Sequence, residues 1–229
     1  MPTPQPAVVL LSGGLDSSVL LHHVAKELHC PAIHALSFNY GQRHGRELVC
    51  AAAQSRIVGT KAHRVMDITF MGTLIQAGSA LIQGGAEVPD LDALTMEELT
   101  QPPTYVPNRN MMLLSMAAAY AEAHGITDIY YGAQAQDEYG YWDCTREFLE
   151  RINAVLALNR KAPVTVHAPF VGYSKEDTVR IGIMLGVDFS QTWSCYRGGE
   201  EACGTCPTCV ERLNAFAANH REDPIGYAS

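Results

Sequence analysis

Residues 12–18 read S-G-G-L-D-S-S, a set of glycines, hydroxyls and one carboxylate that predicts a phosphate-binding turn. The apolar run 7–11 precedes this stretch and apolar residues at helical spacing follow it, so the pattern predicts a strand, a turn and a helix. Such a turn directs backbone N–H groups and the positive end of the helix dipole to one point. The two glycines allow a ligand to approach closely, and the serine hydroxyls supply further donors.

The pattern S-G-G-x-D-S resembles the PP-loop of ATP pyrophosphatases, which adenylate a substrate and release pyrophosphate. It is neither a Walker sequence nor G-x-G-x-x-G. The carboxylate of Asp16 suits this place if Mg²⁺ lies between it and the phosphates, or if it serves the helix N-terminus. A Ser/Gly-rich turn capped by Asp16 is the simpler alternative. The predicted ATP site comprises Leu11, Ser12, Gly13, Gly14, Leu15, Asp16, Ser17, Ser18 and Arg43.

Four of the seven cysteines form a C-x7-C-x2-C-x2-C pattern near the C-terminus. Four thiolates at this spacing suit tetrahedral Zn²⁺ in a closed, structural site, and an iron–sulfur cluster is the less favoured alternative. An odd number of cysteines in a chain without a signal sequence argues against a disulfide framework. The predicted metal ligands are Cys195, Cys203, Cys206 and Cys209.

The polar run 134–145 directly follows a predicted strand, so we expect it at the carboxyl edge of the sheet, where open α/β folds bind ligands. It places three carboxylates among aromatic residues. One carboxylate can accept both donors of a guanine-like base, and an aromatic ring can stack on the base. A solvated acidic loop anchored by its aromatics is an equally good interpretation. The candidates for base recognition are Asp137, Tyr141, Trp142 and Asp143.

Several cationic and amide side chains fall at predicted strand ends or helix starts. They are Arg109 and Asn110 at one helix start, Arg43 in an earlier strand-to-helix loop, and Lys175 at a later helix start. At these places a side chain can reach a phosphate or a carboxylate, although each alone is more often a surface charge.

The elements that position these residues predict an α/β fold. Strand-helix units feeding a third strand imply a parallel sheet with right-handed crossovers. Strands are expected at 7–11, 32–38, 63–68, 128–132 and 164–167, and helices after residue 18 and at 47–58, 109–124, 145–159 and 174–185.

The 229 residues suffice for one α/β core, so we expect a single domain over residues 1–229. The stretch from about 72 to 107, rich in Gly, Pro and acidic residues, is predicted to be a lid-like insertion. Residues from about 190 to 229 form the predicted zinc-binding segment.

The net charge of −8 argues against a large nucleic-acid footprint and favours a small-molecule substrate. No apolar run is long enough to span a bilayer, and the N-terminus lacks the basic and apolar regions of a signal peptide. We therefore expect a soluble, cytoplasmic protein without a membrane partner.

Five separated motifs give the chain a resemblance to 7-cyano-7-deazaguanine synthases from about residue 7 to 224: S-G-G-L-D-S-S, Y-G-Q-R-H, Y-V-P-N-R-N, G-Y-W-D-C and the four-cysteine end. The resemblance implies an enzyme that uses ATP and Mg²⁺ to activate 7-carboxy-7-deazaguanine and converts its carboxylate to a nitrile with ammonia, by way of an amide. It also implies a Rossmann-like PP-loop fold, structural Zn²⁺ and a homodimer. The residues assigned on this basis are Ser12, Asp16, Ser17 and Arg109 for catalysis, and Asp137, Tyr141, Trp142, Asp143, Asn110 and Lys175 for the substrate.

The chain departs from the family pattern in three of its motifs. Trp142 stands where the family usually has proline, and Thr145 where it has arginine. A frequent E-x-D is A-Q-D at 135–137, and P-G-R-N is P-N-R-N at 107–110. Trp142 and Thr145 motivate a rival enzyme that stops at the amide and uses another amine, such as a protein N-terminus. More distant rivals are a tRNA-modifying PP-loop enzyme, which the acidic balance disfavours, and a nucleotide-binding regulator without turnover.

Overall fold

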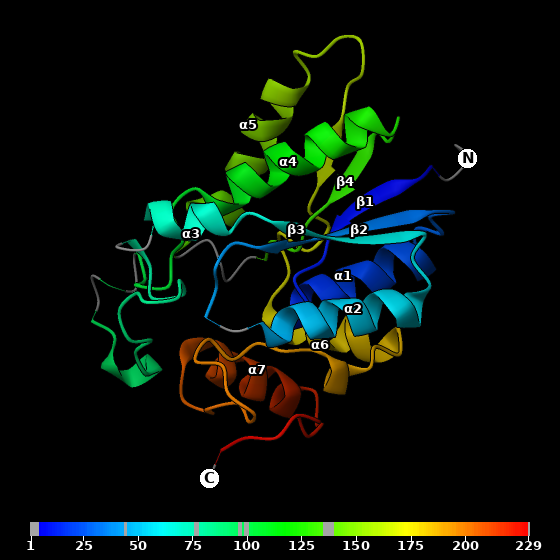
Figure 1. The fold of residues 1–229 in the computed structure, drawn as a ribbon. Coiled ribbons are helices and arrows are strands. Elements are labelled where there is room, and N and C mark those ends of the chain that lie inside the picture. Colours follow the sequence, from blue (N-terminus) through cyan, green and yellow to red (C-terminus); the bar gives the residue numbers. More distant parts are fainter. Residues whose placement is uncertain are drawn as a thin grey trace.

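The computed structural model describes residues 5–43, 45–75, 78–95, 98, 101–134 and 140–228. Its centre is a five-stranded parallel sheet in the order β3-β2-β1-β4-β5 (Figure 1). The predicted parallel α/β fold is therefore confirmed. The strands are β1 (Ala7–Leu10), β2 (Ile33–Asn39), β3 (Ala62–Asp67), β4 (Asp128–Tyr130) and β5 (Thr165–His167).

Helices cover both faces of the sheet (Figure 1). One face carries α1 (Leu15–Lys26), α2 (Arg46–Val58) and α6 (Lys175–Met184), and the other carries α4 (Arg109–Ala123) and α5 (Arg146–Leu156). Successive strand residues point to opposite faces, so β1 contributes Val8 to one apolar core and Val9 to the other. Burial on both faces explains why the central strands read as continuous apolar runs.

The predicted strands and helices are present, with ends within three residues of those expected, except that α1 begins at Leu15, inside the stretch 12–18 that was expected to precede it. Local signals account for this agreement. Gly59 ends α2 in the left-handed conformation at φ +75°, and Ser174 starts α6 with a capping box that includes Asp177. The helices α3 (Thr69–Ile75) and α7 (Pro207–Ala218) were not predicted.

The described part of the segment 72–107 contains the end of α3, turns, a bridge between Ile82 and Gln42, and a 3₁₀ turn at Leu91–Ala93. It packs onto the body through the buried residues Leu81 and Ile82, and the guanidinium of Arg43 donates to carbonyl oxygens at Ala80, Gly85 and Ala86. These contacts attach the described part of the segment to the loop that follows β2.

The order of the strands creates a switch point at this edge. From β1 the chain goes to β2 on one side, and β4 later pairs with the other side of β1. In open α/β sheets the crevice at such a point is the usual ligand site. No helix in the part of the chain that the structure describes is long and apolar enough to cross a membrane.

Candidate functional site

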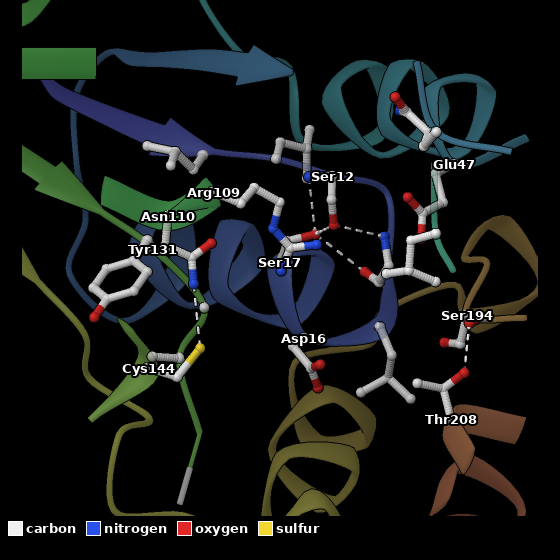
Figure 2. A pocket seen from close by; sticks show the side chains of 18 of the residues that line it. Ser12, Asp16, Ser17, Glu47, Arg109, Asn110, Tyr131, Cys144, Ser194 and Thr208 are labelled. Carbon is white, nitrogen blue, oxygen red and sulfur yellow. Dashed lines mark hydrogen bonds between the residues drawn. The ribbon is translucent and has the colours of Figure 1, made fainter. Parts of the chain in front are cut away.

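A cavity of about 280 Å³ lies at the carboxyl ends of β1 and β4 (Figure 2). Its walls are the PP-loop, the start of α4 and the segment that leads into α7. Ten of the predicted site residues line it, namely Leu11, Ser12, Gly14, Leu15, Asp16, Ser17, Arg109, Asn110, Tyr141 and Lys175. Gly13, Ser18, Arg43, Trp142 and Asp143 do not line the cavity. Asp137 lies outside the described residues.

The hydroxyl of Ser17 organises the PP-loop. It accepts hydrogen bonds from the backbone N–H groups of Ser12 and Gly13, at 3.2 and 3.3 Å, and lies 2.9 Å from the Ser12 hydroxyl. A phosphate would use the same N–H donors. The Ser17 hydroxyl therefore holds the loop in a phosphate-binding conformation.

Gly13 is required by the close approach of α2 to this loop. Its φ is +90°, and a Cβ at this position would lie 1.9 Å from the carbonyl oxygen of Glu47. The carbonyl oxygen of Gly13 in turn accepts the backbone N–H of Trp193 at 3.0 Å. The loop is therefore fixed from both sides.

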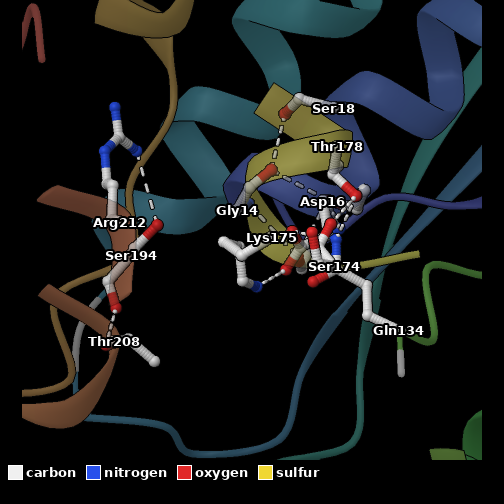
Figure 3. Close-up of polar contacts among 12 residues, drawn as sticks. Gly14, Asp16, Ser18, Gln134, Ser174, Lys175, Thr178, Ser194, Thr208 and Arg212 are labelled. Carbon is white, nitrogen blue, oxygen red and sulfur yellow. Dashed lines mark hydrogen bonds and ion pairs between the residues drawn. The ribbon is translucent and has the colours of Figure 1, made fainter. Parts of the chain in front are cut away.

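Asp16 is held by two side chains that come from distant parts of the chain (Figure 3). Lys175, the first residue of α6, lies 2.7 Å from one carboxylate oxygen, and the amide nitrogen of Gln134 donates to the other at 2.7 Å. The same Gln134 nitrogen donates to Thr178 at 2.7 Å. The lysine predicted as a substrate contact is therefore part of the PP-loop environment and brings a positive charge to it.

Arg109 is the first residue of α4 and lines the cavity. Its guanidinium carbon lies 6.0 Å from the centre of the Tyr40 ring. Burial lowers the pKa of Arg109, but Tyr40, Tyr196 and Cys144 more than offset this effect, so its pKa is raised overall. The guanidinium keeps its charge and suits an anion in the cavity.

Asp143 lies behind the cavity lining and is 3% exposed. Its carboxylate accepts the backbone N–H of Asn110 at 3.1 Å, and the Asn110 side chain donates to the Cys144 sulfur at 3.2 Å. Burial raises the pKa of Asp143, whereas the charge of Arg109 and the Asn110 N–H oppose that rise. The structure thus places this carboxylate at the N-terminus of α4, where negative charge is favourable.

The two aromatic residues before Asp143 point in different directions. Tyr141 lines the cavity, and its hydroxyl lies 2.7 Å from that of Thr104. Trp142 is 46% exposed, and its indole N–H donates to the hydroxyl of Tyr105 at 2.7 Å. Only the tyrosine is placed to touch a ligand in the cavity.

The four cysteines converge as predicted. The sulfur atoms of Cys195, Cys203, Cys206 and Cys209 all lie within 4.8 Å of one another, and three of the four residues are buried. Backbone N–H groups donate to two of the sulfurs, from Cys203 to Cys195 at 3.4 Å and from Cys206 to Cys203 at 3.3 Å. A compact set of four thiols with N–H donors fits a metal ion such as zinc.

The cysteine segment also forms one wall of the cavity, which the sequence did not predict. Ser194, Thr208, Glu211 and Arg212 line it, and the Thr208 hydroxyl donates to the Ser194 carbonyl at 2.8 Å. A signal for this wall was present, because Pro207 is typical of the first position of a helix and Thr208 and Glu211 share a helix face at spacing three.

A preformed phosphate loop at a switch point, with a lysine and an arginine lining the same cavity, defines a nucleotide-binding α/β protein of the PP-loop class. Residues 6–220 match the family model described as "Queuosine biosynthesis protein QueC". The chain belongs to the QueC family.

Two relatives agree with this placement, and a solved structure shares the fold. The chain is 47% identical over 221 residues to the 7-cyano-7-deazaguanine synthase of Marinobacter nauticus, covering 96% of each chain. It is 42% identical to the protein of that name from Pseudoalteromonas atlantica, covering 97% of this chain and 99% of the relative. The fold is similar to that of the NMN synthetase from Francisella tularensis, at a TM-score of 0.51 and 12% identity, over 96% of this chain and 78% of that chain.

Proposed function

We propose that this chain uses ATP to activate the carboxylate of 7-carboxy-7-deazaguanine and joins it to ammonia, giving 7-cyano-7-deazaguanine. The observation that carries the proposal is one cavity lined by a PP-loop, Lys175 and Arg109 in a chain 47% identical to a 7-cyano-7-deazaguanine synthase. Adenylation converts a poor leaving oxygen into AMP, so that neutral ammonia can displace it and form the amide. A second activation, now of the amide oxygen, would remove that oxygen and leave the nitrile.

The cavity residues divide into two groups under this proposal. The PP-loop N–H groups, the hydroxyls of Ser12 and Ser17, and Lys175 bind the phosphates. Arg109 stabilises the negative charge that develops on the reacting carboxyl and phosphate oxygens. Preorganised donors of this kind contribute most where water is excluded.

The partly buried carboxylate of Asp16 fits Mg²⁺, since this ion takes one or two carboxylates and completes its shell with phosphate oxygens and water. Bound there, Mg²⁺ would neutralise phosphate charge. Lys175 lies 2.7 Å from one Asp16 oxygen and orients the carboxylate. We also propose that the four cysteines hold structural zinc, that residues 72–107 act as a lid, and that the enzyme is a cytoplasmic homodimer.

Base recognition is assigned to Tyr141, which lines the cavity, and to Asp137. The carboxylate would accept the N1–H and exocyclic amine of the deazaguanine, and the tyrosine ring would contact its face. An analogue without the amine leaves an acceptor unpaired and should be rejected.

The rival that stops at the amide gains no specific support. Neither residue that motivated it lines the cavity: Trp142 bonds to Tyr105, and the Thr145 hydroxyl caps α5 by accepting the Phe148 N–H at 3.0 Å. Both side chains therefore make local contacts outside the cavity.

The test is to incubate the zinc-loaded chain with ATP, Mg²⁺, ammonia and 7-carboxy-7-deazaguanine. We expect pyrophosphate release and a nitrile product by mass spectrometry. Asp16→Asn should abolish release and leave the fold intact, whereas Glu150→Gln, an exposed change on α5, should have no effect. An amide as the final product would support the rival, and no release with the acid would refute the proposal.

A further inference from the structure

Trp142 does not line the cavity, yet its indole N–H donates a hydrogen bond to Tyr105, which lies in the segment that leads to Arg109. We propose that Trp142 is a positioning residue: through the Tyr105 hydroxyl it holds the turn at Asn108 and thereby fixes the Arg109 guanidinium in the cavity. The inference rests on the proposed function only in giving Arg109 a part in the reaction.

The Tyr105 hydroxyl is the centre of this arrangement. Its oxygen accepts the indole N–H of Trp142 at 2.7 Å and the backbone N–H of Asn108 at 3.1 Å. A phenolic oxygen has two lone pairs, so these donors fill its accepting capacity. The residue is 8% exposed, and its backbone N–H donates to the Pro102 carbonyl at 2.8 Å, so its place is fixed on the backbone side as well.

The Tyr105 hydroxyl supports the turn at Asn108. This residue has φ +54° and ψ +21°, the left-handed region that, among residues with a Cβ, asparagine enters most readily. It immediately precedes α4, so its N–H has no helical acceptor. Arg109 is the next residue, and the backbone direction at Asn108 sets where the guanidinium points.

Trp142 is itself held by the α5 scaffold. Its ring meets that of Phe148 edge to face, with centroids 5.5 Å apart at 84°. The two neighbours of Trp142 contact the same segment that Trp142 contacts. The hydroxyls of Tyr141 and Thr104 are hydrogen-bonded, and Asp143 accepts the backbone N–H of Asn110. Of these contacts, the one from Trp142 reaches Asn108, the residue before Arg109, through the Tyr105 hydroxyl.

Trp142→Phe removes the indole N–H but keeps an aromatic ring that can still pack on Phe148. The variant therefore tests the hydrogen bond apart from the packing. Losing one hydrogen bond to a partly buried oxygen should lower kcat for pyrophosphate release by about 3–10-fold and leave the KM for ATP within about 2-fold. Tyr105→Phe should lower kcat at least as much. Because both changes break the same chain of bonds, the double variant should lose no more than Tyr105→Phe alone. Tyr173→Phe, an exposed tyrosine elsewhere, is the control.

Two readouts separate positioning from general stability. In an Arg109→Ala background, Trp142→Phe should reduce the residual rate no further. Hydrogen–deuterium exchange in Trp142→Phe should be faster over residues 104–112 and unchanged in α1 and α6. An unchanged exchange rate over 104–112, or an equal loss of kcat with and without Arg109, would overturn the inference. Failure of the unaltered chain to release pyrophosphate with the acid would refute only the proposed function, since exchange still reports whether Trp142 holds the turn.

Discussion

Breaking the ion pair between Arg212 and Asp223 should be a strongly destabilising single change. Both side chains are 1% exposed, and the pairing is bidentate at 2.6 and 2.9 Å. The guanidinium also donates to the Thr192 hydroxyl at 2.8 Å and the Phe189 carbonyl at 3.1 Å, and the Tyr227 hydroxyl donates to Asp223 at 2.6 Å. The pair thereby ties the C-terminal segment to the stretch beside the PP-loop.

Asp223→Asn keeps the shape of the side chain and leaves a guanidinium buried without its counter-charge. Breaking a buried pair in this way typically reduces the free energy of unfolding by about 3–5 kcal/mol. For a chain of this size, that corresponds to a fall in Tm of about 6–20 °C. The matched control is Arg151→Met, which removes an ion pair to Glu147 whose side chains are 77% and 71% exposed and should change stability by less than about 1 kcal/mol.

Thermal and urea unfolding with zinc in excess would measure the difference. ATP affinity should fall together with stability, because Arg212 lines the cavity and Trp193, next to its partner Thr192, bonds to the Gly13 carbonyl. If Asp223→Asn lowers the free energy of unfolding no more than Arg151→Met does, the reasoning is refuted.

Three further changes follow from the same geometry. Gly13→Ala should abolish ATP binding, as measured by calorimetry, because the new Cβ would lie 1.9 Å from the carbonyl oxygen of Glu47. Cys206→Ser should lower the metal content measured by mass spectrometry from about one ion per chain, and lower Tm with it. Burial lowers the pKa of His22 below 6.5 in the folded chain, so the unfolded chain binds more protons as the pH falls. The free energy of unfolding that depends on neutral His22 is therefore fully present above pH 6.5 and is lost as the pH falls through the folded pKa. His22→Gln should therefore flatten the fall of the urea midpoint between about pH 7.5 and 5.

The sheet and the PP-loop were predictable because their signals are local. The run 7–11 and the residues 12–18 that follow it specify strand, turn and helix by their own sequence, as Gly59 and Ser174 specify helix ends. The cysteine spacing is likewise a local pattern, and the four sulfurs do converge.

Contacts between distant segments were not predictable. Lys175 meets Asp16 across 159 positions, so no window of sequence contains both residues, and the lysine was instead assigned to the substrate. The network around Arg212 depends on α7, which was not predicted: the helix begins within the cysteine pattern, where the C-x2-C spacing is typical of a metal-binding turn.

Asp143 shows how the two kinds of information combine. Composition places it among candidates for base recognition, but only the fold shows that its carboxylate accepts the Asn110 N–H, next to Arg109. Asp143→Asn should therefore disturb the start of α4 and lower kcat for 7-carboxy-7-deazaguanine and its 2-desamino analogue by the same factor. Asp137→Asn, if this residue meets the base, should instead reduce the preference for the natural acid. The ratio of kcat/KM for the two compounds distinguishes the roles, and a changed ratio in Asp143→Asn would show that this carboxylate reads the base after all.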